Sequence, residues 1–326
     1  MSTHTTRLNP VFEGLRPAVS RQSDAAHPGL LRNAEPGWRH AFASCRGLLR
    51  KLLGSHRLHA GRARSYSAPV TIGNALRDRW QRVFDVPDTT TVPLLYSQGV
   101  GSLLYARVFD DLGINRKHLL HLKHLTVHVA GVPACAAAQR QQLVCSLKRA
   151  LRMAHDKALV ELHTQVLASD GSVQAVVEDS FLIRHLPAAD LAALPGDCSV
   201  MRELVGLRGR RPQIDLGAPA ACARWLPVPH DFGAAYAGVC GDVNPAHGAR
   251  SGPRLFGSRR PFLQGMGVRN LVACQLADMG VPLDRFSLTF ASPAYLGQTL
   301  SLVVHGERHE LHDERGRLVA YGEASA

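Results

Sequence analysis

A carboxylate, an amide and an imidazole crowd together in residues 236–247, beside residues that dictate the shape of the backbone. On a straight helix the side chains of Asp242 and His247 would point about 140° apart, so they could not act on one small molecule as helical neighbours. Gly241 permits a positive φ just before the carboxylate, while Pro245 lacks an N–H and excludes the preceding residue from the helical region. The sequence therefore predicts a tight, rigid loop that aims both side chains at one water.

The same stretch has a simpler interpretation. Asp-x-Asn-Pro is typical of an Asx-turn that enters a helix, and His247 would then merely be exposed. The whole string, however, resembles the hydratase motif of the MaoC-like family of (R)-specific enoyl-CoA hydratases and dehydratases, in which an aromatic residue is followed by a small-Gly-Asp-x-Asn-Pro-x-His run. The matching residues are Tyr236, Gly241, Asp242, Asn244, Pro245 and His247, with Cys240 at the small position. This resemblance favours a catalytic loop over a plain turn.

Length and composition indicate a globular protein of two domains. The chain has 326 residues, of which 45% are hydrophobic and 20% charged, and it contains no apolar run long enough to predict a membrane-spanning helix. The net charge is +12, but residues 1–66 hold 11 Lys and Arg against 3 Asp and Glu, or +8, which leaves +4 for the rest. Because no nucleic-acid-binding motif accompanies this charge, we expect no nucleic-acid partner.

The cysteines indicate a reducing compartment. They are seven in number and include no C-x-x-C pair, which predicts free thiols. They are Cys45, Cys135, Cys145, Cys198, Cys222, Cys240 and Cys274. We therefore expect a cytoplasmic protein, or a mitochondrial matrix protein if the source is eukaryotic.

Residues 1–66 form a basic N-terminal extension, which we expect to be disordered apart from a short amphipathic helix over residues 38–53. The stretch 41–67 lacks acidic residues, which also suits a transit peptide or a contact with an anionic surface. Transit signals usually begin nearer the first residue, so the inert, disordered interpretation is preferred.

The chain then shows the same order of elements twice, helix first and strands after it. The first half has two predicted helices before its strands, and the second half has one. In residues 67–186 the predicted helices are 75–84 and 94–112, and the predicted strands are 125–129, 142–147, 158–168 and 173–183. A linker punctuated by prolines covers residues 187–222. In residues 223–326 a helix over 266–279 is followed by strands at 285–290, 299–305, 307–312 and 318–323.

A short repeat strengthens this correspondence. Gln98-Gly99-Val100-Gly101 opens the long helix of the first half, and Gln264-Gly265-Met266-Gly267 opens that of the second, which indicates a duplication. The family resemblance implies that each unit is a hotdog fold. The expected fold is thus an α+β double hotdog, with two helix-wrapped antiparallel sheets in one chain.

The two halves are expected to differ in chemistry. The segment between Asp85 and Gln98 contains no histidine, so residues 67–186 are interpreted as a degenerate hotdog that accommodates the acyl chain. Residues 223–326 are interpreted as the catalytic hotdog.

The resemblance implies reversible hydration of a trans-2-enoyl-CoA to a (3R)-3-hydroxyacyl-CoA. Asp242 and His247 would share the proton transfer with one water, and Asn244 would orient that water or brace the loop. Gly265 lies at a predicted helix start, where free N–H groups and the helix dipole can stabilise an oxyanion. Alternatives are a 3-hydroxyacyl-[acyl carrier protein] dehydratase and a non-catalytic acyl-thioester-binding protein.

Other residues would contact the substrate. Gln264 stands where the family has a histidine, and Ala273 stands where some members have a serine, which puts efficiency or substrate geometry in question. A basic segment could bind the phosphates of CoA or phosphopantetheine, or it could be a solvated loop. Its members are Arg250, Arg254, Arg259 and Arg260. No metal or redox cofactor is expected, the partner is an acyl-CoA or acyl-carrier-protein substrate, and a homodimer is compatible with the resemblance.

Two further patterns are assigned no chemistry. The histidines at 118, 121, 124 and 128 could suggest a metal site, but alternation with Leu125, Val127 and Val129 predicts a strand whose polar face carries the imidazoles. Cys240 is interpreted as a small packing residue, because a nucleophilic thiolate needs a base placed beside it.

Overall fold

A computed structural model describes residues 56–62, 65–71, 74–85, 104–129, 140–153, 156–195, 214, 222–242, 244–248, 252–255 and 258–326. The first half contains η3 (Ala60–Arg62), β1 (Tyr66–Thr71), α2 (Asn74–Phe84), a helix of residues 104–111, η4 (Arg116–His118), β2 (Leu119–His128), β3 (Arg140–Arg152), β4 (Ala158–Leu167), β5 (Val173–Ile183) and α4 (Ala188–Ala192). The second contains β6 (Cys222–Val228), α6 (Phe232–Cys240), η5 (Pro245–His247), α7 (Gly252–Leu255), α8 (Gly265–Asp278), β7 (Arg285–Phe290), β8 (Gln298–His305), β9 (Arg308–His312) and β10 (Leu318–Ser325).

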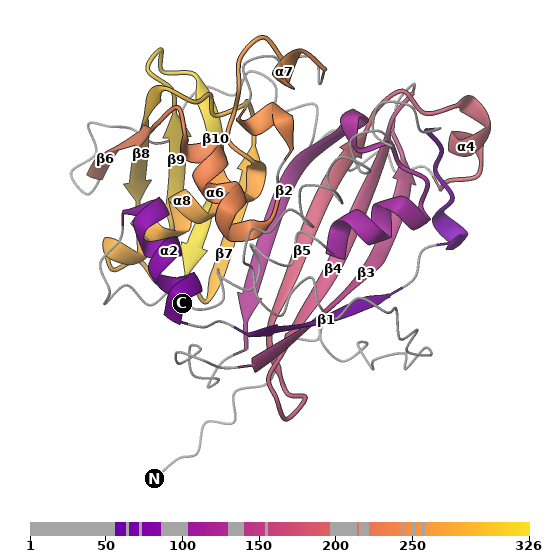
Figure 1. The fold of residues 1–326 in the computed structure, drawn as a ribbon, viewed down its shortest axis with the longest axis horizontal. Helices are drawn as coiled ribbons and strands as arrows, with labels where there is room; N and C mark the ends of the chain where they lie inside the picture. Colours follow the sequence, from indigo (N-terminus) through magenta and orange to yellow (C-terminus); the bar gives the residue numbers. More distant parts are fainter. Residues whose placement is uncertain are drawn as a thin grey trace.

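The ten strands form one antiparallel sheet in the order β1-β3-β4-β5-β2-β7-β10-β9-β8-β6 (Figure 1). Within each half the spatial order is first, third, fourth, fifth, second strand, so both halves have the same topology. The α+β class is confirmed, but the expected pair of separate sheets is corrected to one continuous sheet. The reason is the seam between β2 and β7, which runs from the pair Lys123 and Thr289 to the pair Val127 and Arg285. Pairing these strands removes two sheet edges that would otherwise be open.

The halves also share one hydrophobic core. A single cluster of buried residues includes side chains of β3, β4 and β5 as well as those of α6, α8 and β8. Moreover, α2 packs against α6 and α8 of the second half (Figure 1). Its Trp80 and Phe84 rings lie 6.2 and 5.8 Å from the Tyr236 ring. Such aromatic pairs bury large apolar surfaces, so α2 fastens the first half to the helix that precedes the predicted loop.

Most predicted elements are present, and the differences have local causes. The strand and helix patterns of the second half match α8 and β7–β10 within two residues at each end. Strands β1 and β6 were not predicted, because each lies at an edge of the sheet and carries a weak apolar alternation. The expected loop over residues 236–247 is wrong in its first part, since α6 continues to Cys240 with Tyr236 and Val239 buried.

The boundary at residue 66 also needs correction. Leu58 is buried in the core, the N–H of His59 donates to Leu112 O, and the N–H of Leu58 donates to the Asp190 carboxylate. Residues 56–62 therefore pack on the first half. The helix over 38–53, the 98–101 repeat and most of the 187–222 linker lie outside the described residues, although α4 occupies the start of that linker.

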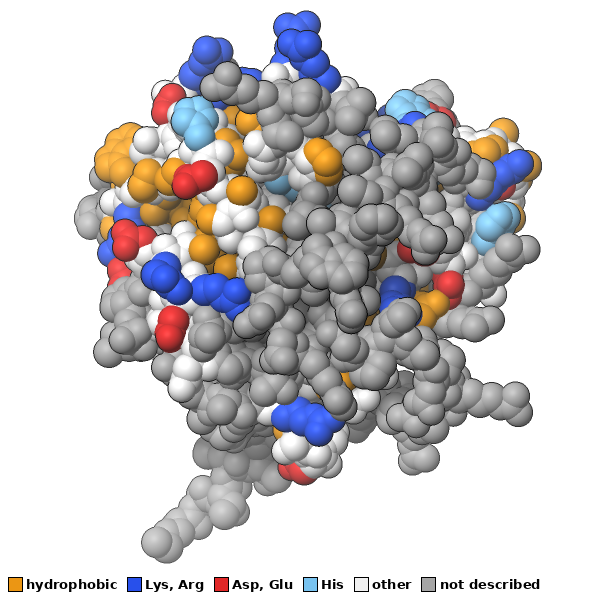
Figure 2. Space-filling view, in the orientation of Figure 1, with side chains coloured by type: hydrophobic (Ala, Val, Ile, Leu, Met, Phe, Trp, Pro, Cys, Tyr) orange, Lys and Arg blue, Asp and Glu red, His pale blue; other side chains and the backbone are white. Residues whose placement is uncertain are grey.

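Surface and composition add three observations. Within the described residues, none of the helices has the length and apolar character needed to cross a membrane. The cysteines at 145, 222, 240 and 274 are free thiols, as predicted. On the face drawn in Figure 2, Lys and Arg side chains of the described surface stand in separate small groups rather than in one patch.

Buried histidines predict how stability depends on pH. Burial lowers the pKa of His309, on β9, from 6.5 to about 4. Between these values the unfolded chain binds the proton that the folded chain excludes, so stability is complete above pH 6.5 and falls as the pH drops toward 4. At about 1.4 kcal/mol per pKa unit, this histidine contributes at most about 3 kcal/mol to that loss.

We expect the His309→Phe variant to show a smaller decrease in the free energy of unfolding between pH 7 and pH 4.5 than the wild type. Urea titrations at both pH values measure it. His305→Phe, at an exposed position, should follow the wild-type pH dependence. Identical pH dependence in the wild type and His309→Phe would contradict the prediction.

Candidate active site

The backbone turns sharply after α6, as Gly241 and Pro245 predict. Gly241 ends the helix with φ 78°, and its N–H donates to Ala237 O at 2.8 Å. Asn244 Oδ1 then accepts from the N–H of Ala246 at 3.2 Å, and Pro245 begins η5. The Asx-turn of the simpler interpretation is therefore present, but it does not leave His247 exposed, because His247 ends η5 and is buried.

His247 is held on two sides. A Cβ atom at Gly233 would lie 1.9 Å from His247 O, so only glycine allows α6 to pack this closely against η5. The ring packs edge-on against Phe262, and Nδ1 lies 2.8 Å from Phe262 O. Since a carbonyl oxygen can only accept, Nδ1 carries the hydrogen and the neutral ring keeps its lone pair at Nε2. That is the form a general base requires. Sequence reasoning did not identify Gly233 or Phe262.

Gln264 connects this turn to the start of α8. Its Nε2 donates to Gly233 O and to Asp242 O, each at 3.2 Å, and its side chain is buried. The amide thus braces the backbone of Asp242, and a contact between Gln264 and substrate remains a prediction. Gly265 is the first residue of α8, whose first-turn N–H groups have no acceptor within the helix.

The remaining predicted positions differ in their surroundings. Arg254 and Arg259 are exposed, whereas the Arg260 guanidinium lies 4.9 Å from the centre of the Tyr295 ring. Arg250 lies outside the described residues. Cys240 and Ala273 are buried packing residues, and burial raises the pKa of the Cys240 thiol, which opposes a nucleophilic role.

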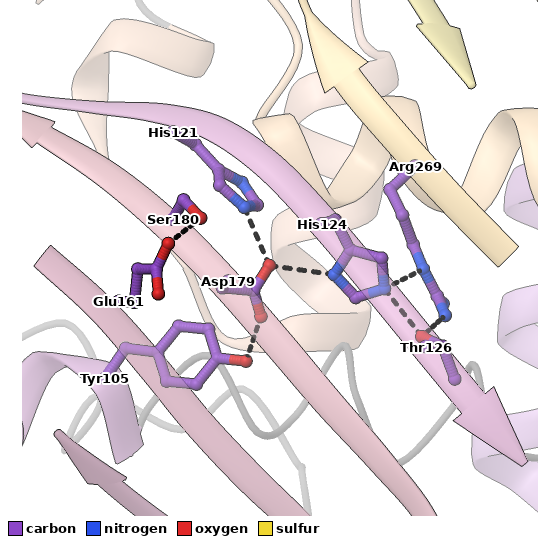
Figure 3. A network of polar contacts seen from close by, with 8 residues as sticks. All are labelled: Tyr105, His121, His124, Thr126, Glu161, Asp179, Ser180 and Arg269. Carbon is purple, nitrogen blue, oxygen red and sulfur yellow. Dashed lines mark hydrogen bonds and ion pairs between the residues drawn. The ribbon is translucent and has the colours of Figure 1, made fainter. Parts of the chain in front are cut away.

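A polar network that the sequence did not reveal lies at the seam (Figure 3). The Asp179 carboxylate, on β5, accepts hydrogen bonds from His121 Nε2 at 2.7 Å and from His124 Nδ1 at 2.8 Å, and a third from the Tyr105 hydroxyl. From α8, Arg269 Nε donates to His124 Nε2 at 3.0 Å. Asp179 is fully buried and Arg269 almost so.

The strand prediction for these histidines is confirmed by β2, but the polar face is turned inward. His124 and Thr126 are buried, while Leu125 and Val127 are only half-buried. A β-bulge between His121 and Lys123 leaves one extra residue in β2. Because of this bulge, His121 and His124 contact the same carboxylate although they are three positions apart. The available sequence signal was Arg269, which is the one Lys or Arg residue in α8.

Electrostatics assign the protonation states of the network. Burial alone would raise the pKa of Asp179, but the neighbouring His124 and His121 hold it far below its usual range. Burial lowers the pKa of His124 to about 4 and that of Arg269 to about 10. At neutral pH a neutral His124 therefore lies between a carboxylate and a guanidinium, donating to one and accepting from the other. His121, His124 and Asp179 offer ligand atoms within 4.8 Å of one another, and these hydrogen bonds account for that proximity.

This arrangement predicts that loss of Arg269 is costly. Arg269→Met removes the buried guanidinium together with its hydrogen bonds to His124 Nε2 and Thr126 Oγ1, and with it the positive charge that helps to offset the buried Asp179 carboxylate, so the free energy of unfolding should fall by about 3–5 kcal/mol. Urea denaturation measures the change, and the double variant Arg269→Met/Asp179→Asn should recover part of it. Arg224→Met is the matched control, because Arg224 pairs with Asp278 at the surface, and it should cost less than about 1 kcal/mol. A loss for Arg269→Met no greater than that of the control would refute the assignment.

Comparison with known proteins places the fold. No protein-family model and no curated protein sequence matches the chain. Among solved structures, HtdX of Mycobacterium tuberculosis superimposes with a TM-score of 0.62 at 18% identity, covering 81% of this chain and 100% of that one. A MaoC-like dehydratase from Phytophthora capsici gives a TM-score of 0.62 at 14% identity, with coverage of 82% and 98%.

The peroxisomal multifunctional enzyme type 2 of Drosophila melanogaster gives a TM-score of 0.58 at 17% identity. The match covers 89% of this chain but 53% of that longer chain. At these identities the likeness concerns the fold. The chain therefore has the fold of HtdX and of MaoC-like dehydratases.

Proposed function

We propose that this protein is a hydro-lyase that reversibly adds water to a trans-2-enoyl-CoA to give a (3R)-3-hydroxyacyl-CoA. The observation that carries the proposal is the link from the acid–base loop to the helix start. Asp242 and His247 flank a turn that Asn244 braces, and Gln264, the residue before Gly265, donates a hydrogen bond to the backbone oxygen of Asp242. The fold shared with MaoC-like dehydratases supports it.

Each part of this site has a defined task in the reaction. In the hydration direction His247 Nε2, with Asp242, removes a proton from water as its oxygen bonds to the β-carbon. The electron pair of the double bond moves toward the thioester, and the charge on its oxygen is stabilised by the Gly265 N–H at the positive end of α8. The proton returns to the α-carbon. Asn244 uses Oδ1 to brace the turn, which favours bracing over water orientation.

The proposal also covers features that the fold alone leaves open. On the family resemblance and composition we propose a (3R) product, a reaction without a metal or redox cofactor, and a location in the cytoplasm, or in the mitochondrial matrix if the source is eukaryotic; a homodimer is compatible with the resemblance. We assign residues 223–326 to catalysis and residues 67–186 to accommodation of the acyl chain.

A carrier-protein dehydratase is the second candidate, because the exposed Arg254 and Arg259 suit an acidic protein surface. Tighter, salt-sensitive binding of acyl carrier protein than of CoA would favour it.

A hydration assay tests the proposal. Loss of the absorbance of the conjugated thioester, measured with crotonyl- through dodecenoyl-CoA, should be catalysed by the wild type. Asp242→Ala and His247→Ala should each lower kcat by about 10²-fold or more. Asp231→Ala is the matched control, since Asp231 is exposed and makes no side-chain cap hydrogen bond at the start of α6. It should retain wild-type rates.

Two results would contradict the proposal. Wild-type rates in both site variants at every chain length would remove Asp242 and His247 from the site. Binding of enoyl-CoA with no absorbance loss in the wild type would instead indicate a non-catalytic acyl-thioester-binding protein.

A further inference from the structure

His121 is built into the seam by contacts from three sides. Its ring stacks on Phe181 of β5, with centroids 4.6 Å apart and planes 18° apart, and lies 4.6 Å from the Phe290 ring of β7. The third contact is the Asp179 carboxylate, 2.7 Å from Nε2. The side chain keeps 12% of its surface exposed, whereas Asp179 has none. His121 is therefore fixed in orientation and still partly accessible.

The other ring nitrogen faces the start of α8. A Cβ atom built on Gly265 would lie 2.8 Å from His121 Nδ1 and 3.3 Å from His121 Cβ. Glycine at this position thus permits the close approach of the imidazole, in addition to any contact with substrate. The β-bulge in β2 sets the face to which His121 points, and bulges commonly re-aim side chains beside active sites. Nδ1 consequently lies beside Gly265, the residue whose amide we assign to the thioester oxygen.

We propose that His121, oriented by Asp179, is a second hydrogen-bond donor to the thioester oxygen and acts together with the N–H of Gly265. This inference rests on the proposed function, because it assumes a thioester bound at Gly265. It also assigns a catalytic residue to the first half, which the sequence predicted to lack any.

The chemistry of the dyad supports a donor. A ring that donates from Nε2 to a carboxylate can also donate from Nδ1 only when it is an imidazolium, so the proposal takes His121 in that form beside the Asp179 carboxylate. The other charged group in this network is Arg269, which His124 separates from Asp179. As negative charge develops on the thioester oxygen, it offsets the charge of the imidazolium. No proton leaves His121, so the atoms of the hydration reaction balance as before.

An interaction that strengthens in the transition state affects kcat more than KM. With crotonyl-CoA, His121→Leu and His121→Phe should lower kcat by about 10²-fold, with KM changed less than about threefold. His121→Phe keeps the aromatic contacts with Phe181 and Phe290 if the leucine variant fails to fold. His121→Gln restores a donor and should recover most of kcat. His128→Leu, on the same strand, is the control and should retain wild-type kcat.

A second readout does not require turnover. Butyryl-CoA labelled with ¹³C at the carbonyl is saturated and cannot be hydrated, and hydrogen bonds to its oxygen lower the carbonyl stretching frequency. Isotope-edited infrared spectra should show a lower frequency on the wild type and on His121→Gln than on His121→Phe.

The two readouts separate the outcomes. If the wild type lowers the carbonyl frequency, His121→Phe does not, and the wild type shows no turnover, His121 is supported as a donor and the proposed hydratase activity is rejected. Turnover by the wild type with equal kcat and equal frequency in His121→Phe would reject the donor and keep the hydratase. A fall in kcat without a frequency change, or equal losses in His121→Gln and His121→Phe, would also reject the donor. Failure of the wild type to bind butyryl-CoA would overturn both.

Discussion

The arrangement of the halves depends on two buried charges, the Asp179 carboxylate and the Arg269 guanidinium, which a neutral His124 connects through hydrogen bonds. Both charges lie in the interior, where an unpaired ion is strongly unfavourable. Asp179 belongs to the first half and Arg269 to the central helix of the second. The hydrogen bonds that offset these two charges therefore hold α8 against β2 of the first half as well as against its own sheet. Arg269 Nη1 also donates to Asn270 Oδ1, and the Asn270 amide donates to the Tyr236 hydroxyl of α6. The network therefore extends to the helix that precedes the turn between Asp242 and His247.

The same register places the start of α8. Gly265 and Arg269 are four positions apart and share one face of the helix, and the bulge in β2 gives His121 and His124 a common face as well. Arg269 meets His124, and Gly265 meets His121. Two glycines permit the close contacts at the site, since Gly233 allows α6 to reach His247 and Gly265 allows His121 to reach the helix start. The position of the Gly265 amide is thus tied to the turn between Asp242 and His247 through Gln264, and to the first half through the seam.

Duplication gives the two halves the same strand order, and the seam gives them different roles. Joining second strand to second strand closes two edges and puts β2 beside β7, so the side chains of one half lie against the helix of the other. The first half lacks the turn with Asp242 and His247, yet it contributes α2 to the shared core and Asp179 to the network. The first half can therefore support the site that we propose in its neighbour.

The sequence by itself determined the local features. Gly241 and Pro245 shape the turn that holds His247, the apolar alternation marks β4, β5 and β7–β10, and the Gly-Met-Gly run marks the start of α8, because each depends on residues close together in the chain. The tertiary structure decided the rest. It extended α6 to Cys240 through burial of Tyr236, merged two expected sheets into one, and left Arg254 and Arg259 exposed. It also turned the histidine face of β2 inward. The sequence could not predict this, because the partner carboxylate of Asp179 lies more than fifty positions away and a one-residue bulge puts His121 and His124 on a common face. Pairing over that distance, and a slip of one residue in register, leave no periodic signal in a single sequence.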